Sequence, residues 1–195
     1  MGRWAPDASG RLAQAAMALY AEQGFEKTTA AEIAARAGLT ERTFFRHFAD
    51  KREVLFYGTD SLQDMLTGAI AGAPPDATAM DAVGAALQAA GAVIEETPDL
   101  ARLRNEIVSA NAELRERELT KMAELAAAMA GALRERGVLD PAASLAGETG
   151  IAVFRVAFTR WISETGQPGL PAILRESMEQ LKDVLAPAMR AEVRA

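Results

Sequence analysis

The chain has 195 residues, a formal net charge of −6 at pH 7 and no cysteine, which excludes disulfides and thiolate metal sites. Its single histidine, His47, excludes a histidine metal cluster or a histidine-based catalytic triad elsewhere in the chain. Alanine occurs 43 times, against nine valines and seven isoleucines, and this excess of the best helix former predicts an all-α protein.

The charge is divided unevenly along the chain. Residues 1–58 hold eight Lys/Arg and seven Asp/Glu, a balance of +1, whereas residues 59–195 hold 13 against 20, a balance of −7. A surface that binds phosphate therefore belongs to the first segment, and the acidic remainder disfavours contact with DNA or an anionic membrane. The longest uncharged apolar run has 13 residues and the N-terminus lacks a secretory signal, so we expect a soluble, cytoplasmic protein.

The first predicted helix runs from Ser9 to Gly24, after a short arm of about ten residues. A disordered end is the preferred interpretation of the arm, although Arg3 and Arg11 leave contact with DNA open. Gly24 is expected to end the helix. Its predicted buried stripe consists of Leu12, Ala16, Leu19 and Phe25.

Residues 29–48, TAAEIAARAGLTERTFFRHF, predict two short helices joined by a tight turn. Thr28 or Thr29 is a hydroxyl N-cap, with Glu32 at capping-box distance from Thr29, and Gly38 is expected to end that helix. Thr40 can cap the second helix. Phe44 and Phe48 lie four residues apart on one face, which leaves an outer face of Arg42, Thr43, Phe45, Arg46 and His47. This pattern is that of a helix-turn-helix.

A further helix is predicted to begin at Asp50 and to continue to about Gly72, where Pro74 and Pro75 follow. Because this helix would begin beside the helix pair and end in the rest of the chain, it is expected to link the two parts mechanically. Further helices are predicted after the Thr78 and Thr97 caps, over about 111–136 and 141–164, and through the stripe from Leu174 to Met189.

The predicted helix over 141–164 is apolar nearly all the way round between Ile151 and Ile162, which indicates burial on more than one side. Together with the last helix it carries more apolar surface than one small body should hide, so we expect a homodimer with a four-helix interface. The expected interface residues are Ile151, Trp161, Leu174, Met178, Leu181 and Leu185.

The first 56 residues closely resemble the tetracycline-repressor (TetR) family of transcriptional regulators. The matching segments are AMALYAEQGFEKTT (16–29, as A-x-x-LYAEQGFEKTT), EIAARAGLT (32–40), TFFRHF (43–48) and DKREVL (50–55). The resemblance implies a helix-turn-helix DNA-binding domain in residues 1–50, with its motif at 29–48. It also implies a helical ligand-binding and dimerisation domain in residues 51–195.

The resemblance also implies roles for side chains in the first domain. Arg42 and Thr43 fall in the first turn of the second helix, where recognition helices contact base edges. The family usually has tyrosine at the place of Phe45, so one phosphate hydrogen bond is missing here. The expected DNA-binding residues are Thr28, Thr29, Thr40, Arg42, Thr43, Phe45, His47 and Lys51.

The family's body encloses an apolar cavity for a small molecule, and candidate lining residues occur on several predicted helices. They are Phe56, Leu62, Met65, Leu66, Leu103, Ile107, Met122, Leu125, Met129, Phe154 and Phe158. Methionine suits adaptable pockets, yet a methionine stripe at helical spacing also describes plain core. Arg155 interrupts an apolar helix and is expected to pair with a carboxylate, with an anionic ligand as the alternative.

These observations predict a DNA-binding transcriptional regulator, most simply a repressor of a palindromic operator that a small apolar or amphipathic effector releases. The alternative is a non-enzymatic helical module that binds protein. No enzymatic function, catalytic residue, metal or cofactor is expected, because acidic groups such as Glu113, Glu116 and Glu118 are explained by solvated helix faces.

Overall fold

The computed structural model describes residues 8–163 and 168–185, which form helices and no strands. The all-α prediction is confirmed. The chain divides into two compact units: residues 1–60 with 102–117, and residues 61–101 with 118–195. The first unit is therefore built from two separate segments of the chain, whereas the sequence predicted a single boundary after residue 50.

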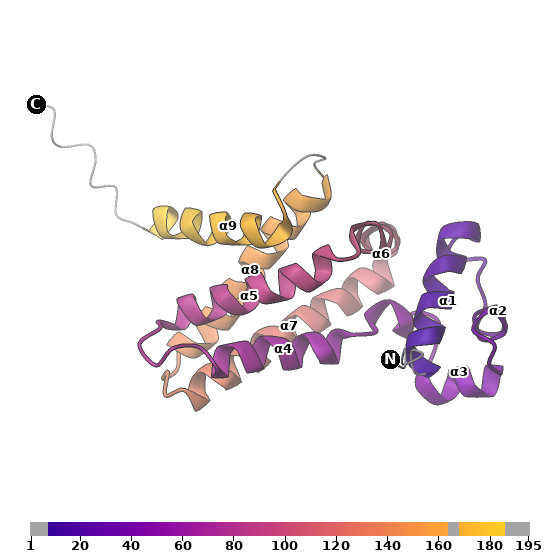
Figure 1. Cartoon of the computed structure of the whole chain (residues 1–195), viewed down its shortest axis with the longest axis horizontal. Helices are drawn as coiled ribbons and strands as arrows, with labels where there is room; N and C mark the ends of the chain where they lie inside the picture. Colours follow the sequence, from indigo (N-terminus) through magenta and orange to yellow (C-terminus); the bar gives the residue numbers. More distant parts are fainter. Residues whose placement is uncertain (1–7, 164–167, 186–195) are drawn as a thin grey trace, which may run out of the picture. The chain divides into compact units, whose positions relative to one another are not determined.

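The first unit contains three helices that follow one another in the chain: α1 (Ala8–Gln23), α2 (Ala30–Arg36) and α3 (Glu41–His47), drawn in indigo and violet in Figure 1. The 3₁₀ turn η1 (Glu53–Phe56), most of α6 (Pro98–Ala110) and the start of α7 (Ala112–Glu135) complete it. Its core is built from buried side chains of all these elements, including Leu12, Leu19, Ile33, Phe44, Phe48, Val54, Phe56, Val108 and Leu114.

The predicted continuous helix from Asp50 to Gly72 is wrong. The carboxylate of Asp50 accepts hydrogen bonds from the amides of Arg52 and Glu53, and the turn η1 follows. The chain then leaves the helical conformation, because Gly58 has a φ of +91°, which favours glycine. The helix α4 (Thr59–Ala71) begins only after this break.

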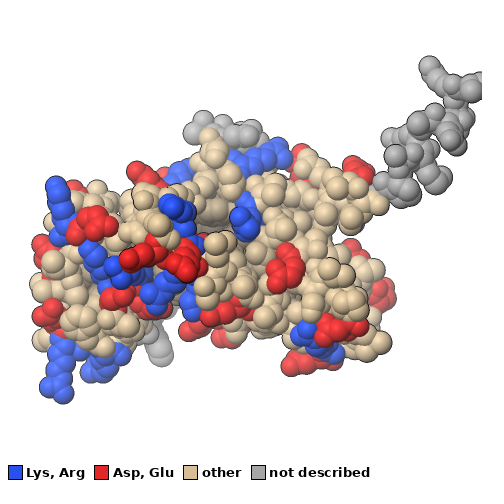
Figure 2. All heavy atoms as spheres, turned by 180° about the vertical axis from the view of Figure 1, so that it is seen from behind, with Lys and Arg blue, Asp and Glu red and all other residues tan. Residues whose placement is uncertain are grey.

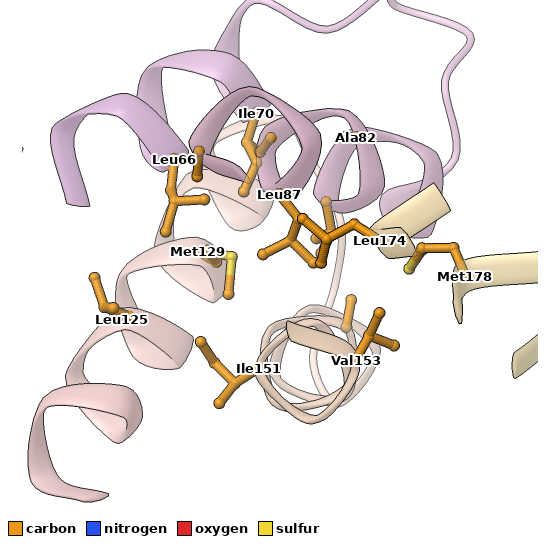
Figure 3. Close-up of a cluster of buried hydrophobic side chains, with 14 of the residues drawn as sticks. Leu66, Ile70, Ala82, Leu87, Leu125, Met129, Ile151, Val153, Leu174 and Met178 are labelled. Carbon is orange, nitrogen blue, oxygen red and sulfur yellow. The ribbon is translucent and has the colours of Figure 1, made fainter. Parts of the chain in front are cut away.

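The second unit consists of α4, α5 (Ala79–Glu95), most of α7, α8 (Ala142–Ser163) and α9 (Leu170–Leu185). Helices α5, α8 and α9 pack against one another, and Figure 3 shows their side chains meeting those of α4 and α7 in one apolar core. Apart from α4, these bounds agree with the predicted helices to within a few residues, and Met189 lies outside the described residues.

Small residues bring the helices of the second unit close together. A Cβ atom at Gly147 would lie 2.4 Å from the carbonyl oxygen of Ala126, so the backbones of α7 and α8 are in contact there. A Cβ atom at Gly91 would lie 2.7 Å from the Leu174 side chain, so this side chain of α9 packs directly against the backbone of α5. No helix in the described part of the chain is long and apolar enough to cross a membrane.

Candidate nucleic-acid interface

The N-terminus of α2 is fixed by the predicted capping box. The amide of Glu32 donates to the Thr29 hydroxyl at 3.3 Å, and the Thr29 amide donates to the Glu32 carboxylate at 2.8 Å. Hydrogen bonds from the hydroxyl and the amide of Thr29 hold the pKa of the Glu32 carboxyl below its usual value. The beginning of the first motif helix is thus set by local sequence, as predicted.

The turn between α2 and α3 is a Schellman motif. Gly38 has a φ of +68°, its amide donates to Ala35 O at 3.0 Å, and the Leu39 amide donates to Ala34 O at 2.8 Å. Thr40 then caps α3 by accepting a hydrogen bond from the Thr43 amide at 3.2 Å. The two helices and their turn are therefore held by backbone and capping bonds within the motif.

The helix α3 is anchored by its inner aromatic side chains. Phe44 is fully buried and its ring contacts that of Phe48, with ring centroids 5.6 Å apart. Phe45 points outward, with 53% of its surface exposed, and meets the Phe44 ring edge-on. The anchored inner face leaves the outer face of α3 free for a ligand.

Six of the eight predicted DNA-binding residues are accessible in the structure. Thr43 is half-buried, and the exposed ones are Thr29, Thr40, Arg42, Phe45 and His47. Arg46, which was not among the predicted contacts, is also exposed on α3, and its place on the outer face of TFFRHF is the signal that identifies it. Their contacts with DNA stay a prediction.

The remaining two predicted DNA-binding residues are engaged inside the first unit. Thr28 is 1% exposed, and its hydroxyl donates to Gly24 O at 2.9 Å. The ammonium of Lys51 donates to the carbonyl oxygens of Phe25, Glu26 and Thr28 at 2.8, 3.0 and 3.0 Å. All three N–H donors of Lys51 are thus used by protein, which favours a positioning role over direct phosphate binding.

Tyr20 extends the network around Lys51. Its hydroxyl donates to the Lys51 carbonyl oxygen at 2.6 Å, and burial, with a smaller effect of the Asp50 charge, raises the pKa of the phenol. The phenol therefore stays protonated and keeps its donor. The connection between α1 and α2 and the segment after α3 are held together by these bonds.

The segment η1 is held by the parts of α6 and α7 that belong to the first unit. The guanidinium groups of Arg104 and Arg117 lie 5.2 and 5.6 Å from the centroid of the Phe56 ring. Arg104 also donates to Leu55 O at 2.7 Å, and Arg117 pairs with Glu53. These residues are 49 to 64 positions apart in sequence, so no local pattern could reveal the contact.

The predicted ligand-lining residues are divided between the two cores. Phe56 is buried in the first core, Ile107 packs on it, and Leu103 belongs to the same unit. Those in the second unit are Leu66, Leu125 and Met129, which are buried, and Leu62, Met65, Met122, Phe154 and Phe158, which are half-buried against that core. The rings of Phe154 and Phe158 stack with centroids 5.6 Å apart.

The predicted dimer-interface residues lie mostly in the core of their own protomer. Ile151, Trp161, Leu174 and Met178 are buried and Leu181 is half-buried, whereas Leu185 is 72% exposed. The apolar stripe predicted for the last helix is present on α9, but α5 of the same protomer covers it at Leu174 and Met178. The expected carboxylate partner of Arg155 is also not found, because Arg155 is exposed and forms no ion pair with any described residue.

Two family models match the chain. Residues 12–57 match bacterial regulatory proteins of the tetR family, and residues 77–186 match the MftR C-terminal domain. The regulator TcmR of Streptomyces glaucescens, described as an HTH-type transcriptional regulator, is 33% identical over 79 residues. That match covers 40% of this chain and 35% of the length of TcmR.

Solved structures share the fold. FadR of Thermus thermophilus, a TetR-family transcriptional repressor in complex with lauroyl-CoA, has a TM-score of 0.60 at 24% identity, covering 92% of this chain and 95% of that one. FadR of Bacillus subtilis, in complex with stearoyl-CoA, has a TM-score of 0.66 at 19% identity, covering 88% and 96%. At these identities the similarity establishes the fold alone.

The position of the Lys51 ammonium generates a stability prediction. Lys51→Ala leaves three carbonyl oxygens without their donor and should lower the free energy of unfolding by about 1–3 kcal/mol, measured by urea denaturation. The control is Lys27→Ala, which removes an exposed lysine from the same connection. Equal midpoints for Lys51→Ala and the wild type would contradict the positioning role.

Proposed function

Because the chain belongs to the tetR family of bacterial regulatory proteins, we propose that it is a repressor that binds a palindromic operator as a homodimer. We further propose that a small apolar or amphipathic ligand releases it from DNA. The observation that carries the proposal is the outer face of α3, where Arg42, Phe45 and Arg46 are exposed on a helix anchored by Phe44.

The charges of the first unit support DNA binding by placement rather than by number. On the face shown in Figure 2, blue Lys and Arg side chains lie among red Asp and Glu side chains over this unit, at the left. Arg36 is paired with Glu22 and Arg52 with Glu113, whereas Arg42 and Arg46 stand exposed on α3. The exposed arginines of α3 are therefore the cations best placed to meet base edges and phosphates.

The alternative of a protein-binding module loses its support from the sequence, because residues 12–57 match the family of bacterial regulators. The same outer face of α3 that could meet a protein has two arginines, a threonine and a histidine, the side chains that DNA-reading helices use. The regulator function therefore accounts for both the family and the surface.

A homodimer is supported by apolar side chains that the second unit leaves uncovered on two packed helices. Val156 on α8 is 64% exposed, and Val184 and Leu185 on α9 are 80% and 72% exposed. A two-fold contact through α8 and α9 would cover them, and two heads are needed to bind two half-sites of a palindrome. The proposed interface thus uses these residues in place of the buried ones predicted from the stripe.

A ligand site in the second unit is supported by its half-buried apolar side chains. Met65, Met122, Phe154 and Phe158 pack against the core without being enclosed by it. Methionine side chains adapt to ligands of different shape, and the stacked phenylalanine rings offer flat apolar surface. The two FadR structures hold lauroyl-CoA and stearoyl-CoA, so an acyl chain is a suitable first probe.

Arg42 is expected to read a base. Arg42→Ala should weaken operator binding by about 1–3 kcal/mol and relax specificity at one base pair of each half-site, measured by gel-shift titration on a duplex selected from random DNA. Arg52→Ala is the matched loss of one positive charge outside α3. An equal loss on selected and random duplexes for Arg42→Ala would contradict base reading.

The proposed interface can be tested by charge. Val184→Glu combined with Leu185→Glu should yield monomers at micromolar concentration in light scattering and should sharply reduce operator affinity, because buried carboxylates would face each other across the two-fold axis. Leu139→Glu, at a side chain that is 80% exposed before α8, is the control. A monomeric wild type would remove the proposal.

Lauroyl-CoA is expected to raise the thermal midpoint of the free protein and to weaken operator binding on the order of 5–150-fold, with coenzyme A as the control. Phe158→Ala should blunt this response and leave operator binding intact. Binding of lauroyl-CoA without any change in operator affinity would refute the release mechanism.

A further inference from the structure

The ring of Phe45 is exposed on the outer face of α3. More than half of its surface, 53%, is exposed, and it is not among the side chains that form the core of the first unit. Its neighbours on that face are Arg42 and Arg46, both exposed. An exposed apolar ring between cations on a recognition helix would be covered most favourably by an apolar group of the bound DNA.

The ring is also held in place. It meets Phe44 edge-on, with centroids 5.3 Å apart and planes at 87°, and Phe44 is 0% exposed. An aromatic side chain that already rests on a buried ring loses little conformational freedom when it packs against a ligand. Phe45 is thus a preorganised contact rather than a flexible one.

The chemistry of the ring restricts what it can recognise. Phenylalanine has no hydrogen-bond donor or acceptor, so it cannot hydrogen-bond a phosphate oxygen or a base edge. The major groove of unmodified DNA presents one apolar group, the C5-methyl group of thymine, and phenylalanine is one of the side chains that packs against it. At the corresponding place cytosine carries only a hydrogen on C5, and the purines present N7 with O6 or N6.

We propose that Phe45 is a specificity-determining residue that packs against the C5-methyl group of a thymine in each half-site. This inference rests on the proposed operator binding and adds one readable base to it. Burial of one methyl group corresponds to about a fourfold change in affinity, so both half-sites together give about fifteenfold if they act independently. Arg42 and Arg46, on the same face, would supply polar and phosphate contacts.

The test uses a duplex selected by the wild-type protein from random DNA, in which each thymine is replaced in turn by deoxyuridine. This exchange removes only the methyl group and leaves base pairing unchanged. At one thymine in each half-site, related by the two-fold symmetry, the exchange should lower the affinity of the wild type for the duplex about fourfold per half-site. The same exchange should not change the affinity of Phe45→Ala. Tyr57→Ala, which removes a 48% exposed ring outside α3, should keep the sensitivity.

A second measurement does not depend on any variant. At the same position, 5-methylcytosine paired with guanine should bind the wild type about fourfold better per half-site than cytosine paired with guanine, because the methyl group occupies the same place in the groove. This inference alone is overturned if the wild type binds its operator but no exchange of thymine for deoxyuridine has an effect that depends on Phe45. It is also overturned if the wild type shows no preference for 5-methylcytosine over cytosine. A wild type that selects no duplex would remove the proposed function, and this inference with it.

Discussion

The hydrogen bonds of the Lys51 ammonium are the constraint on which the first unit depends. Three backbone carbonyl oxygens of the connection between α1 and α2 accept hydrogen bonds from the Lys51 ammonium, which lies 23 to 26 positions later in the chain. They belong to Phe25, Glu26 and Thr28. The Tyr20 hydroxyl in turn holds the Lys51 carbonyl. Because α2 and α3 lie between these points in the sequence, the bonds close the segment that contains the recognition pair into a loop, and the buried side chains of α1, α2 and α3 pack inside the same unit.

The return of α6 and α7 to the first unit gives the proposed release mechanism a physical basis. Arg104 and Arg117 hold η1 through the Phe56 ring. The first turn of α6 belongs to the second unit, and α7 continues into that unit, where it carries Met122 and Leu125. A ligand that displaces side chains on α7 therefore acts on a helix whose first turns hold η1. The chain breaks at Gly58, so α6 and α7, rather than one long helix after Asp50, are the helices with residues in both units.

Local signals predicted the motif, and tertiary contacts account for what was missed. The capping box at Thr29, the Gly38 turn and the inward Phe44 each depend on residues within a few positions, so the sequence alone specified them. The roles of Lys51 and Thr28 depend on backbone far along the chain or on burial. The stripe of α9 was recognised, but periodicity does not say which helix covers it, and α5 rather than a partner covers Leu174.

We infer that α2 and α3 are held in the DNA-reading conformation before DNA binds. Amide hydrogen exchange of the free protein tests it most directly, at the Gly38 and Leu39 amides that close the turn and at the Thr43 amide that the Thr40 cap binds. We expect these amides to be protected to nearly the same degree as those of α1, with little change when DNA is added. Exchange at the rate of an unstructured chain until DNA is added would contradict it.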